Sequence, residues 1–461
     1  MKNKLFISIY CGLMILLASC NNYLDVKPKG KIIPETAEDF STIIHYWLDQ
    51  IEKGRDDVII PNPEVMTTLE MFADDLNATL ASNFGYTSIY VGSAINKNQA
   101  TYKTLYSVIK DCNMVIGNMD DTESDLARTL LGTAWSIRSI CYYNLMQRYC
   151  EPYQPETAKE TLGLPLVDDF DMEAKPARAN LKETAEFIEE GFRKALSYNV
   201  SNEDFIFTSS VTKAYFARFF FWTQNWSSAI TYAKEVLEKY PMLEADEYVE
   251  AINQKQAKAH NVIIRSFTMD DDIGTMSYAT AQADIKSRPV DRNLVDLFAA
   301  TDNDVRRKCN YDSKRIVNKI ITTKFRSEEL CLIIAEAHAH LNQETDALGY
   351  LNQLRSKRIT QDYIAYTIDN LPEVFQQNIK TDATGIPLTK LMSAILCERR
   401  KELFVEGDRW FELKRNGRPE FWVAAKGKKF ITEKYLYTFP IPKADIRLFP
   451  DLLIQNPGYI L

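Results

Sequence analysis

Apolar residues recur at spacings of three and four along most of this chain, which is the period of one face of an α-helix. Between residues 327 and 357 they form two such stripes, with a short polar turn at Asn342 and Gln343 between them. The stripes are Leu330, Ile333, Ile334, Ala337 and Leu341, and then Ala347, Leu348, Leu351 and Leu354. The segment is therefore predicted to fold as a pair of helices packed against each other.

A second pair with the same layout is predicted at 211–240, because small residues recur there with the same spacing. The spacing is twelve residues in both pairs: Ala217 to Ala229, and Ala335 to Ala347. Small residues let paired helices approach closely, and this arrangement is typical of a divergent tetratricopeptide (TPR) repeat. Further helix pairs are predicted at 101–148 and around 182–198, and one long helix at about 389–415. The fold class is predicted to be all-α, a TPR-like helical-pair scaffold with long irregular loop insertions.

The irregular stretches are predicted at roughly 54–100, 150–180, 242–325 and 358–388, where much of the Gly, Pro, Asn and Asp of the chain is found. Ligand-binding residues concentrate on loops that a rigid scaffold holds in place. These stretches are therefore where a binding site is expected.

The first twenty residues predict export from the cytoplasm. Lys2 and Lys4 precede an apolar run from Leu5 to Ala18, which is shorter than the roughly 20 residues needed to cross a bilayer. The run ends in Leu-Ala-Ser-Cys, which resembles the lipobox of bacterial lipoproteins. Residues 1–19 are thus predicted to be a signal peptide, and Cys20 the acylated first residue of a lipid-anchored protein.

No linker rich in Pro, Gly or Ser divides the rest of the chain. Residues 20–461 are predicted to form a single domain, with an N-terminal part at about 20–240 and a C-terminal part at about 260–461. Of the eight cysteines, six lie beyond the leader, and they form no C-x-x-C pair. Disulfides are possible, but the fold is not expected to need them.

The charge balance argues against a nucleic-acid partner. The 461 residues hold 55 Lys and Arg against 63 Asp and Glu, a net charge of −8, and nucleic acid requires a concentrated positive face. The densest basic run is Lys426, Lys428 and Lys429, which is predicted to be a solvated loop. The chain has 24 Tyr and 6 Trp, whose flat rings with a polar tip suit ligands such as sugars.

Residues 398–417 read ERRKELFVEGDRWFELKRNG and carry interleaved charged and apolar residues. Glu402 and Glu406 have the spacing of an acid/base pair, but carboxylates among so many arginines are predicted to form structural ion pairs. Gly407 costs roughly 1 kcal/mol within a helix, so a bend or a close backbone approach is expected there.

This stretch resembles the late signature of the SusD/RagB family, E-R-R-x-E-L-x-x-E-G-x-R-x-x-D-L-x-R, with Glu412 where the family usually has Asp. The ending, Phe439-Pro440-Ile441-Pro442 and Gln455-Asn456-Pro457-Gly458-Tyr459, also resembles that family, as does Tyr23-Leu24-Asp25 after the lipobox. The resemblance thus runs from the leader to the C-terminus, with the motifs in the expected order.

The resemblance implies a surface-exposed lipoprotein of the outer membrane of a Bacteroidetes-type bacterium. It would capture a glycan and deliver it to a SusC-like TonB-dependent transporter, without breaking a bond itself. The resemblance places the ligand site in the segments 72–92 and 267–290. The polar and aromatic candidates there are Asp74, Asp75, Asn77, Phe84, Tyr86, Tyr90 and Tyr278.

Three alternatives stay open: a peptide-binding RagB-like variant, a secreted glycan hydrolase, and a TPR scaffold that binds only proteins. A hydrolase needs a carboxylate pair or a triad in a cleft, and carboxylate pairs have no sequence signature. No cofactor is expected, because the chain has no P-loop and no G-x-G-x-x-G. No metal site is expected at Glu336, His338 and His340 either, because residues two apart on a helix point to different sides.

We predict that replacing Cys20 with Ala releases the protein from membranes, because the acyl chains that anchor it are then not attached. The measurement is the distribution of the protein between membrane and soluble fractions of the producing cells. Ser19→Thr, which keeps the thiol, serves as the control. Full membrane retention of the Cys20→Ala protein would contradict the prediction.

Overall fold

The structure is a computed structural model, and it describes residues 34–53, 59–82, 91–97, 101–169, 175–254, 259–265, 272–298, 303–321, 323–425 and 427–459. Cys20 and three of the predicted ligand residues, Phe84, Tyr86 and Tyr90, lie outside the described residues. Among the residues described, no helix is both long and apolar enough to cross a bilayer.

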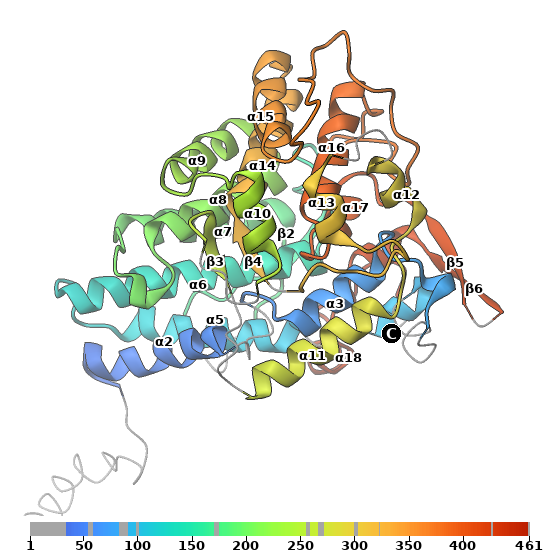
Figure 1. The fold of residues 1–461 in the computed structure, drawn as a ribbon. Helices are drawn as coiled ribbons and strands as arrows, with labels where there is room; N and C mark the ends of the chain where they lie inside the picture. The colour runs from blue at the N-terminus through green and yellow to red at the C-terminus, as the bar shows by residue number, and fades with distance from the viewer. Residues whose placement is uncertain are drawn as a thin grey trace, which may run out of the picture.

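The fold is mainly helical, which confirms the predicted class (Figure 1). In the N-terminal part α6 packs against α5, α7 and α2, and this contact buries almost every side chain of α6. The helices of this part are α2 (Ala37–Glu52), α3 (Pro63–Phe72), α5 (Thr101–Asn118), α6 (Asp125–Tyr149) and α7 (Leu181–Ser197).

Side-chain caps begin these helices where the sequence changes from loop to apolar stripe. The Asn180 side chain accepts a hydrogen bond from the Glu183 amide at 2.9 Å, and Glu183 accepts one from the Asn180 amide at 3.1 Å. This capping box satisfies two amides that the first turn of α7 leaves without a helical partner. Ser124 caps α6 in the same way through the amide of Ala127.

The predicted TPR-like pairs are present as α8 with α9 and α14 with α15. Helix α14 packs against both α9 and α15, so the two pairs form one stack. Ala217, Ala229, Ala335 and Ala347 are fully buried, and their small side chains allow this close packing. The bounds are α8 (Ser209–Trp222), α9 (Trp226–Lys239), α14 (Ser327–His340) and α15 (Glu344–Ser356).

The stretches predicted as irregular contain short helices as well as loops. Helix α11 packs along α3, and described apolar residues between Tyr278 and Ile321 form a second core cluster that includes Ile285, Leu294 and Phe298. These helices are difficult to predict from the sequence because several of them are only one or two turns long. They are α10 (Ala245–Ile252), α11 (Asp272–Lys286), α12 (Arg292–Val295), α13 (Val305–Asn310) and α18 (Lys443–Leu448), with 3-10 turns η1 (Ala78–Leu80), η2 (Gly92–Lys97), η3 (Glu203–Phe205), η4 (Asp296–Phe298) and η5 (Lys434–Tyr437).

The single helix predicted at 389–415 is in fact two helices, α16 (Lys390–Glu402) and α17 (Arg409–Arg415). Gly407 between them has a φ of 77°, and its amide donates to Glu70 Oε1 at 2.7 Å. Val405, in the same turn, also has a positive φ of 57°, and left-handed residues cannot continue a helix, so the chain turns between the end of α16 and the start of α17. The bend expected at Gly407 is confirmed, but its consequence is a complete break.

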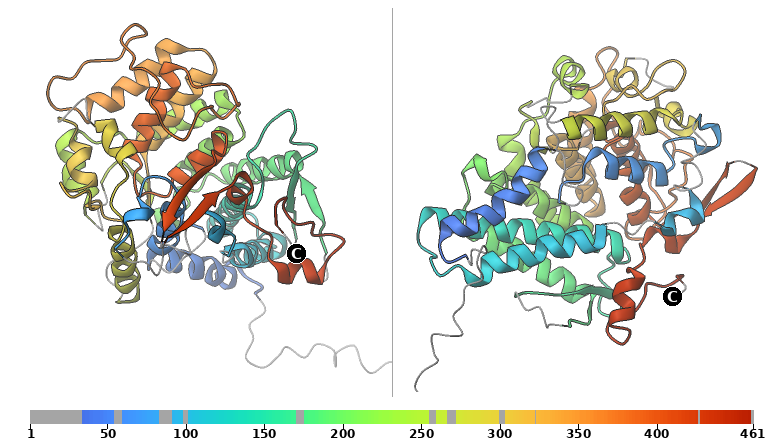
Figure 2. Two further views of the ribbon diagram at one scale, coloured as in Figure 1. Left: turned by 90° about the vertical axis from the view of Figure 1, so that its right-hand side faces the viewer. Right: turned by 90° about the horizontal axis from the view of Figure 1, so that it is seen from below.

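The described strands form three antiparallel two-stranded ribbons. The last of them, β5 with β6, is a hairpin that projects from the body of the protein in Figures 1 and 2. Lys428 and Lys429 belong to β6, so the predicted solvated loop is a strand at these two positions, although both side chains are exposed. The strands are β1 (Leu162–Pro165), β2 (Arg178–Asn180), β3 (Val262–Arg265), β4 (Lys324–Arg326), β5 (Phe421–Ala425) and β6 (Lys428–Thr432).

Polar residues that resemble reactive groups in the sequence have structural partners. The six cysteines that the structure describes form no disulfide with one another. His338 stacks on Tyr350, and His340 stacks on Trp226 with ring centroids 4.1 Å apart. Within the described ranges, no cluster of three or more His, Cys, Asp or Glu side chains has the arrangement of a metal site.

A buried ion network joins the C-terminal segments, and Glu402 lies at its centre. Its carboxylate accepts from Arg326 at 2.8 Å, from Arg358 at 3.0 Å and from Arg306 at 3.3 Å. These arginines come from α13, β4 and the end of the TPR-like stack. We define the Glu402 network as Asp304, Arg306, Lys319, Arg326, Glu328, Arg358, Glu398, Lys401, Glu402 and Glu406.

The Glu402 network as defined has five positive and five negative groups, with Arg355 as a further cation 3.6 Å from Glu398, and its side chains are buried, that of Glu406 being 7% exposed. Arg326 and Lys319 pair with Glu406, and Arg306 also pairs with Glu398 at 2.6 Å. The structural ion pairs predicted for Glu402 and Glu406 are therefore confirmed. Although burial disfavours the charged form, the three arginines hold the pKa of Glu402 well below its usual range.

We predict that Glu402→Gln lowers the free energy of unfolding by about 3–5 kcal/mol, because three buried guanidinium groups lose their shared counter-charge. The measurement is urea unfolding of the protein, followed by circular dichroism. Glu373→Gln is the matched control, because Glu373 pairs only with Lys390 on the surface and its side chain is 86% exposed. The control should change stability by less than about 1 kcal/mol, and an equally small effect of Glu402→Gln would contradict the assignment.

Candidate functional site

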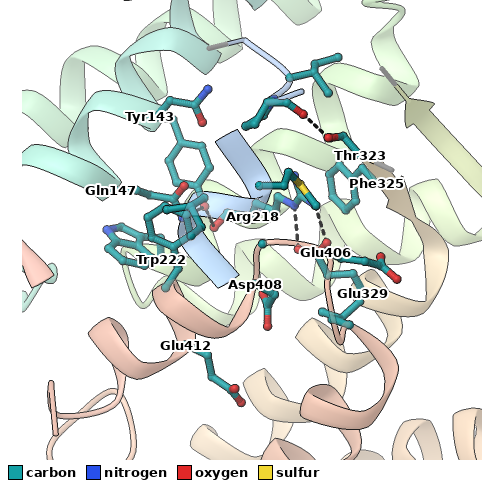
Figure 3. A pocket seen from close by; sticks show the side chains of 18 of the residues that line it. Tyr143, Gln147, Arg218, Trp222, Thr323, Phe325, Glu329, Glu406, Asp408 and Glu412 are labelled. Atoms are coloured by element: carbon teal, nitrogen blue, oxygen red, sulfur yellow. Dashed lines mark hydrogen bonds and ion pairs between the residues drawn. The ribbon is translucent and has the colours of Figure 1, made fainter. Parts of the chain in front are cut away.

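A cavity of about 120 Å³ lies between α6, α8 and the turn from α16 to α17 (Figure 3). Arg218 and Glu329 face each other across part of it, and Figure 3 marks their hydrogen bonds, one of which measures 2.7 Å. Arg399 holds Asp408 at 2.8 Å on another side. Its volume is half that of a second pocket, which lies beside the end of α3.

A pocket of about 240 Å³ opens at the surface, between the segment that follows α3 and the base of the β5–β6 hairpin. We call it the surface pocket. Among the described residues that line it there is no lysine and no arginine. The lining residues on which its chemistry depends are Asp74, Asn77, Asp291, Asn293, Asn378 and Trp422.

Backbone hydrogen bonds hold the floor of the surface pocket together. The Asn77 amide donates to the Pro289 carbonyl at 2.8 Å, and the Asp291 amide donates to the Asp75 carbonyl at 2.8 Å. The Asn77 side chain also donates to Asp291 Oδ2 at 2.9 Å. Two segments more than 200 residues apart in the sequence thus form one surface.

Trp422 on β5 supplies the aromatic face of the surface pocket. Its side chain is 60% exposed, which is unusual for so large an apolar ring. The hairpin that carries it lies against η1 and η2. Gly92, with a φ of 49°, lets η2 approach β6 so closely that an added Cβ would lie 2.5 Å from the Ile431 nitrogen. The position of Trp422 is therefore set by backbone packing.

Asp74 lines the surface pocket, but its carboxylate is already used within the fold. It accepts from Arg409 Nε at 2.7 Å and from Asn378 Nδ2 at 2.8 Å. Burial disfavours its charged form, yet Arg409 and Arg400 together hold the pKa of Asp74 well below its usual range. Asp74 is a fixed, neutralised carboxylate at the floor of the surface pocket.

Two further predicted ligand residues lie in the interior of the structure. Their side chains bind other residues of the fold and are not exposed for direct contact with a ligand. Asp75 is 1% exposed and accepts from Arg400 Nε at 2.5 Å. Tyr278 lies on α11 and not on a loop, is 6% exposed, and donates to Gln282 Oε1 at 3.0 Å. Neither residue lines the surface pocket.

Of the predicted residues that the structure describes, the surface pocket brings together Asp74 and Asn77. For Phe84, Tyr86 and Tyr90 the role in ligand binding stays a prediction, although Val91 lines the surface pocket. Sequence reasoning missed Trp422, Asp291 and Asn378. The signal for Trp422 was the pair of apolar runs at 421–425 and 430–431 on either side of a turn that contains Gly427, which indicates a hairpin.

Two family models match the chain. Residues 305–459 match a family described as "SusD family", and residues 22–221 match one described as "Starch-binding associating with outer membrane". The match at 305–459 includes most of the Glu402 network. No match was found among the curated proteins.

Solved structures show the same fold over nearly the whole chain. A SusD superfamily protein from Bacteroides vulgatus superposes with a TM-score of 0.72 at 18% identity, covering 93% of this chain and 100% of that one. A SusD-like carbohydrate binding protein from the same organism gives 0.67 at 19% identity, covering 91% and 98%. A laminarin binding SusD-like protein gives 0.61 at 17% identity, covering 92% and 99%.

Glu70 on α3 is a buried carboxyl group that faces the turn at Gly407. Burial, and the nearby charge of Asp75, raise the pKa of Glu70 to about 8. A group whose pKa is raised on folding binds its proton more tightly in the folded state. Its contribution to stability is therefore complete below about pH 4.5 and is lost as the pH rises towards 8.

We predict that Glu70→Gln, which mimics the protonated carboxyl group, removes a stability loss of roughly 2–4 kcal/mol between pH 5 and pH 9. The measurement is the free energy of unfolding in urea across that range. Glu64→Gln, at an exposed position of the same helix, is the matched control and should keep the loss. Identical pH profiles for the Glu70→Gln and unchanged proteins would show that Glu70 does not titrate in this range.

Proposed function

This chain belongs to the SusD/RagB-like family, and on that premise we propose that it binds an oligosaccharide at the surface pocket. The observation that carries the proposal is Trp422, an exposed aromatic ring above a floor of carboxylate and amide groups. Sugar rings stack on such faces through their apolar C–H surface while their hydroxyl groups bind polar neighbours. A solved relative in fold is described as laminarin binding, which supports a glycan as the ligand.

The polar groups around Trp422 suit the hydroxyl groups of a sugar. Asn293 is exposed, and its side chain has no hydrogen-bond partner among the described contacts. Asn378 uses its amide nitrogen on Asp74, which leaves its carbonyl oxygen to accept. Asp291 Oδ1 and Oδ2 each accept one hydrogen bond and retain capacity for another. A bound sugar thus meets several acceptors and the mixed donor and acceptor of Asn293.

We infer that the protein binds the glycan without cleaving it. A glycosidase needs one carboxyl group that is protonated near neutral pH and a second carboxylate across the scissile bond. In the surface pocket, Asp74 is held in its charged form by Arg409 and Arg400, so it is a poor proton donor. Two alternatives, a glycan hydrolase and a peptide-binding relative, are tested by the binding and turnover measurements described below.

The proposal extends to the place and the partner of the protein. A lipid at Cys20 would anchor it at the outer membrane, facing outwards, and it would pass its ligand to a SusC-like TonB-dependent transporter. The family description that matches residues 22–221 mentions association with the outer membrane, which supports this location. Copurification of the tagged protein with a large outer-membrane barrel tests the partner independently of any ligand.

We predict that Trp422→Ala weakens oligosaccharide binding by about tenfold or more, because the stacking surface is lost. Isothermal titration calorimetry with a panel of neutral oligosaccharides, laminarin fragments among them, measures this. The thermal melt should change little, since the ring contributes little to the core. Tyr46→Ala, at an aromatic residue of α2 that is 55% exposed, is the matched control. Equal affinities for the Trp422→Ala and unchanged proteins would place the site elsewhere.

The same titrations test the residues that the sequence suggested. If Tyr86 and Tyr90 stack on the sugar as well, Tyr86→Ala and Tyr90→Ala should each weaken binding without lowering the melting temperature. A collapse of the melting temperature would instead identify them as core residues. Turnover of any bound glycan or peptide at an enzyme-like rate would overturn the inference that no bond is cleaved.

A further inference from the structure

The two carboxylates at the surface pocket differ in how they are neutralised. Asp74 has the guanidinium group of Arg409 at 2.7 Å and that of Arg400 at 3.7 Å. Asp291 accepts only from neutral groups, the Asn77 side chain at 2.9 Å and the Asn293 amide at 3.0 Å. Among the ion pairs of the described residues, none includes Asp291. The surface pocket therefore carries one negative charge without a paired cation.

The cations near this charge are directed elsewhere. Arg315 donates to the Val290 carbonyl at 3.0 Å, and none of the lining residues described is a lysine or an arginine. Lys429 lies 4.9 Å from the centre of the Trp422 ring, but it is an exposed side chain outside the lining of the surface pocket. Water screens an exposed charge of this kind far more than a half-buried one.

We propose that the surface pocket selects uncharged sugar units and that Asp291 is the residue that determines this specificity. The inference rests on the proposed function, and it names the class of glycan. Sugar hydroxyl groups donate to a carboxylate, so a neutral unit satisfies Asp291 when water leaves. A uronate or a sulfate ester at the same position places a second negative charge against it and offers no proton. A like charge left without a partner in a partly dry site costs binding free energy.

The size of the effect follows from Coulomb's law. Two like charges about 5 Å apart, at a dielectric constant between those of water and the protein surface, change an affinity by about tenfold. Salt should reduce this ratio, because the surface pocket is open to solvent. The lost hydrogen bonds act in the same direction but do not depend on salt.

The experiment uses the mature protein and matched pairs of oligosaccharides that differ only in charge. The probes are gluco-, xylo- and galacto-oligosaccharides, each as the neutral form and as its O-carboxymethylated form, titrated at about 20 mM and about 300 mM NaCl. For the pair whose neutral form binds, we expect a preference for the neutral form of about tenfold at low salt. Asp291→Asn should reduce the preference to about twofold, while Lys429→Gln should leave it unchanged or increase it.

Asp291→Asn is expected to fold, because asparagine caps a helix start as well as aspartate does and keeps the acceptor for the Asn293 amide, and the two backbone hydrogen bonds of the floor remain when the Asn77 side chain loses its acceptor at Oδ2. If it does not fold, the salt series on the unchanged protein still decides. Equal or tighter binding of the charged forms overturns the inference and leaves the proposed function standing. A preference that Asp291→Asn does not reduce, or that Lys429→Gln abolishes, also overturns it. If no form of any pair binds, the proposed function fails, and this inference fails with it.

Discussion

The fold depends on the neutralisation of one buried carboxylate, that of Glu402. Three guanidinium groups surround it, and they come from α13, from β4 and from the segment just after α15. An unpaired charge at this depth is strongly unfavourable, so no one of these segments can leave without destabilising the others. The TPR-like stack and the short helices of the second core cluster are thereby fixed against α16 by charge as well as by apolar contact.

Helix α16 and the turn after it also connect the Glu402 network to the surface pocket. Arg400 on α16 pairs with Asp75, and Arg409, just beyond the turn at Gly407, pairs with Asp74. The segment that forms the floor of the surface pocket is therefore held by arginines that belong to the scaffold. Binding a ligand does not require this floor to become ordered, which preserves affinity that ordering would otherwise reduce.

The sequence predicted those parts of the fold whose cause is local. Helix pairs with small residues twelve apart leave a periodic pattern, and the charged stretch at 398–417 predicted structural ion pairs around Glu402 and Glu406. The break between α16 and α17 was only partly predictable, because the amide of Gly407 is held by Glu70, a residue 337 positions away. The surface pocket was also not predictable from the sequence. Asp291 and Trp422 are far from Asn77 along the chain and lie beside it only in the folded protein. Asp75 was predicted to contact a ligand because it is a polar residue in a loop segment. In the structure its side chain is buried and pairs with Arg400.

The charged residues of this protein thus form two groups with different roles. Asp74, Asp75 and the Glu402 network are neutralised by arginines and lysines of the scaffold, and their oxygens and nitrogens are largely occupied by one another. Groups so occupied cannot distinguish one ligand from another. At the proposed site, discrimination therefore rests on side chains that the fold leaves exposed or uncompensated, which are Trp422, Asn293 and Asp291. On that proposal, substitutions at these three positions change the ligand while the ion pairs that hold the floor stay intact.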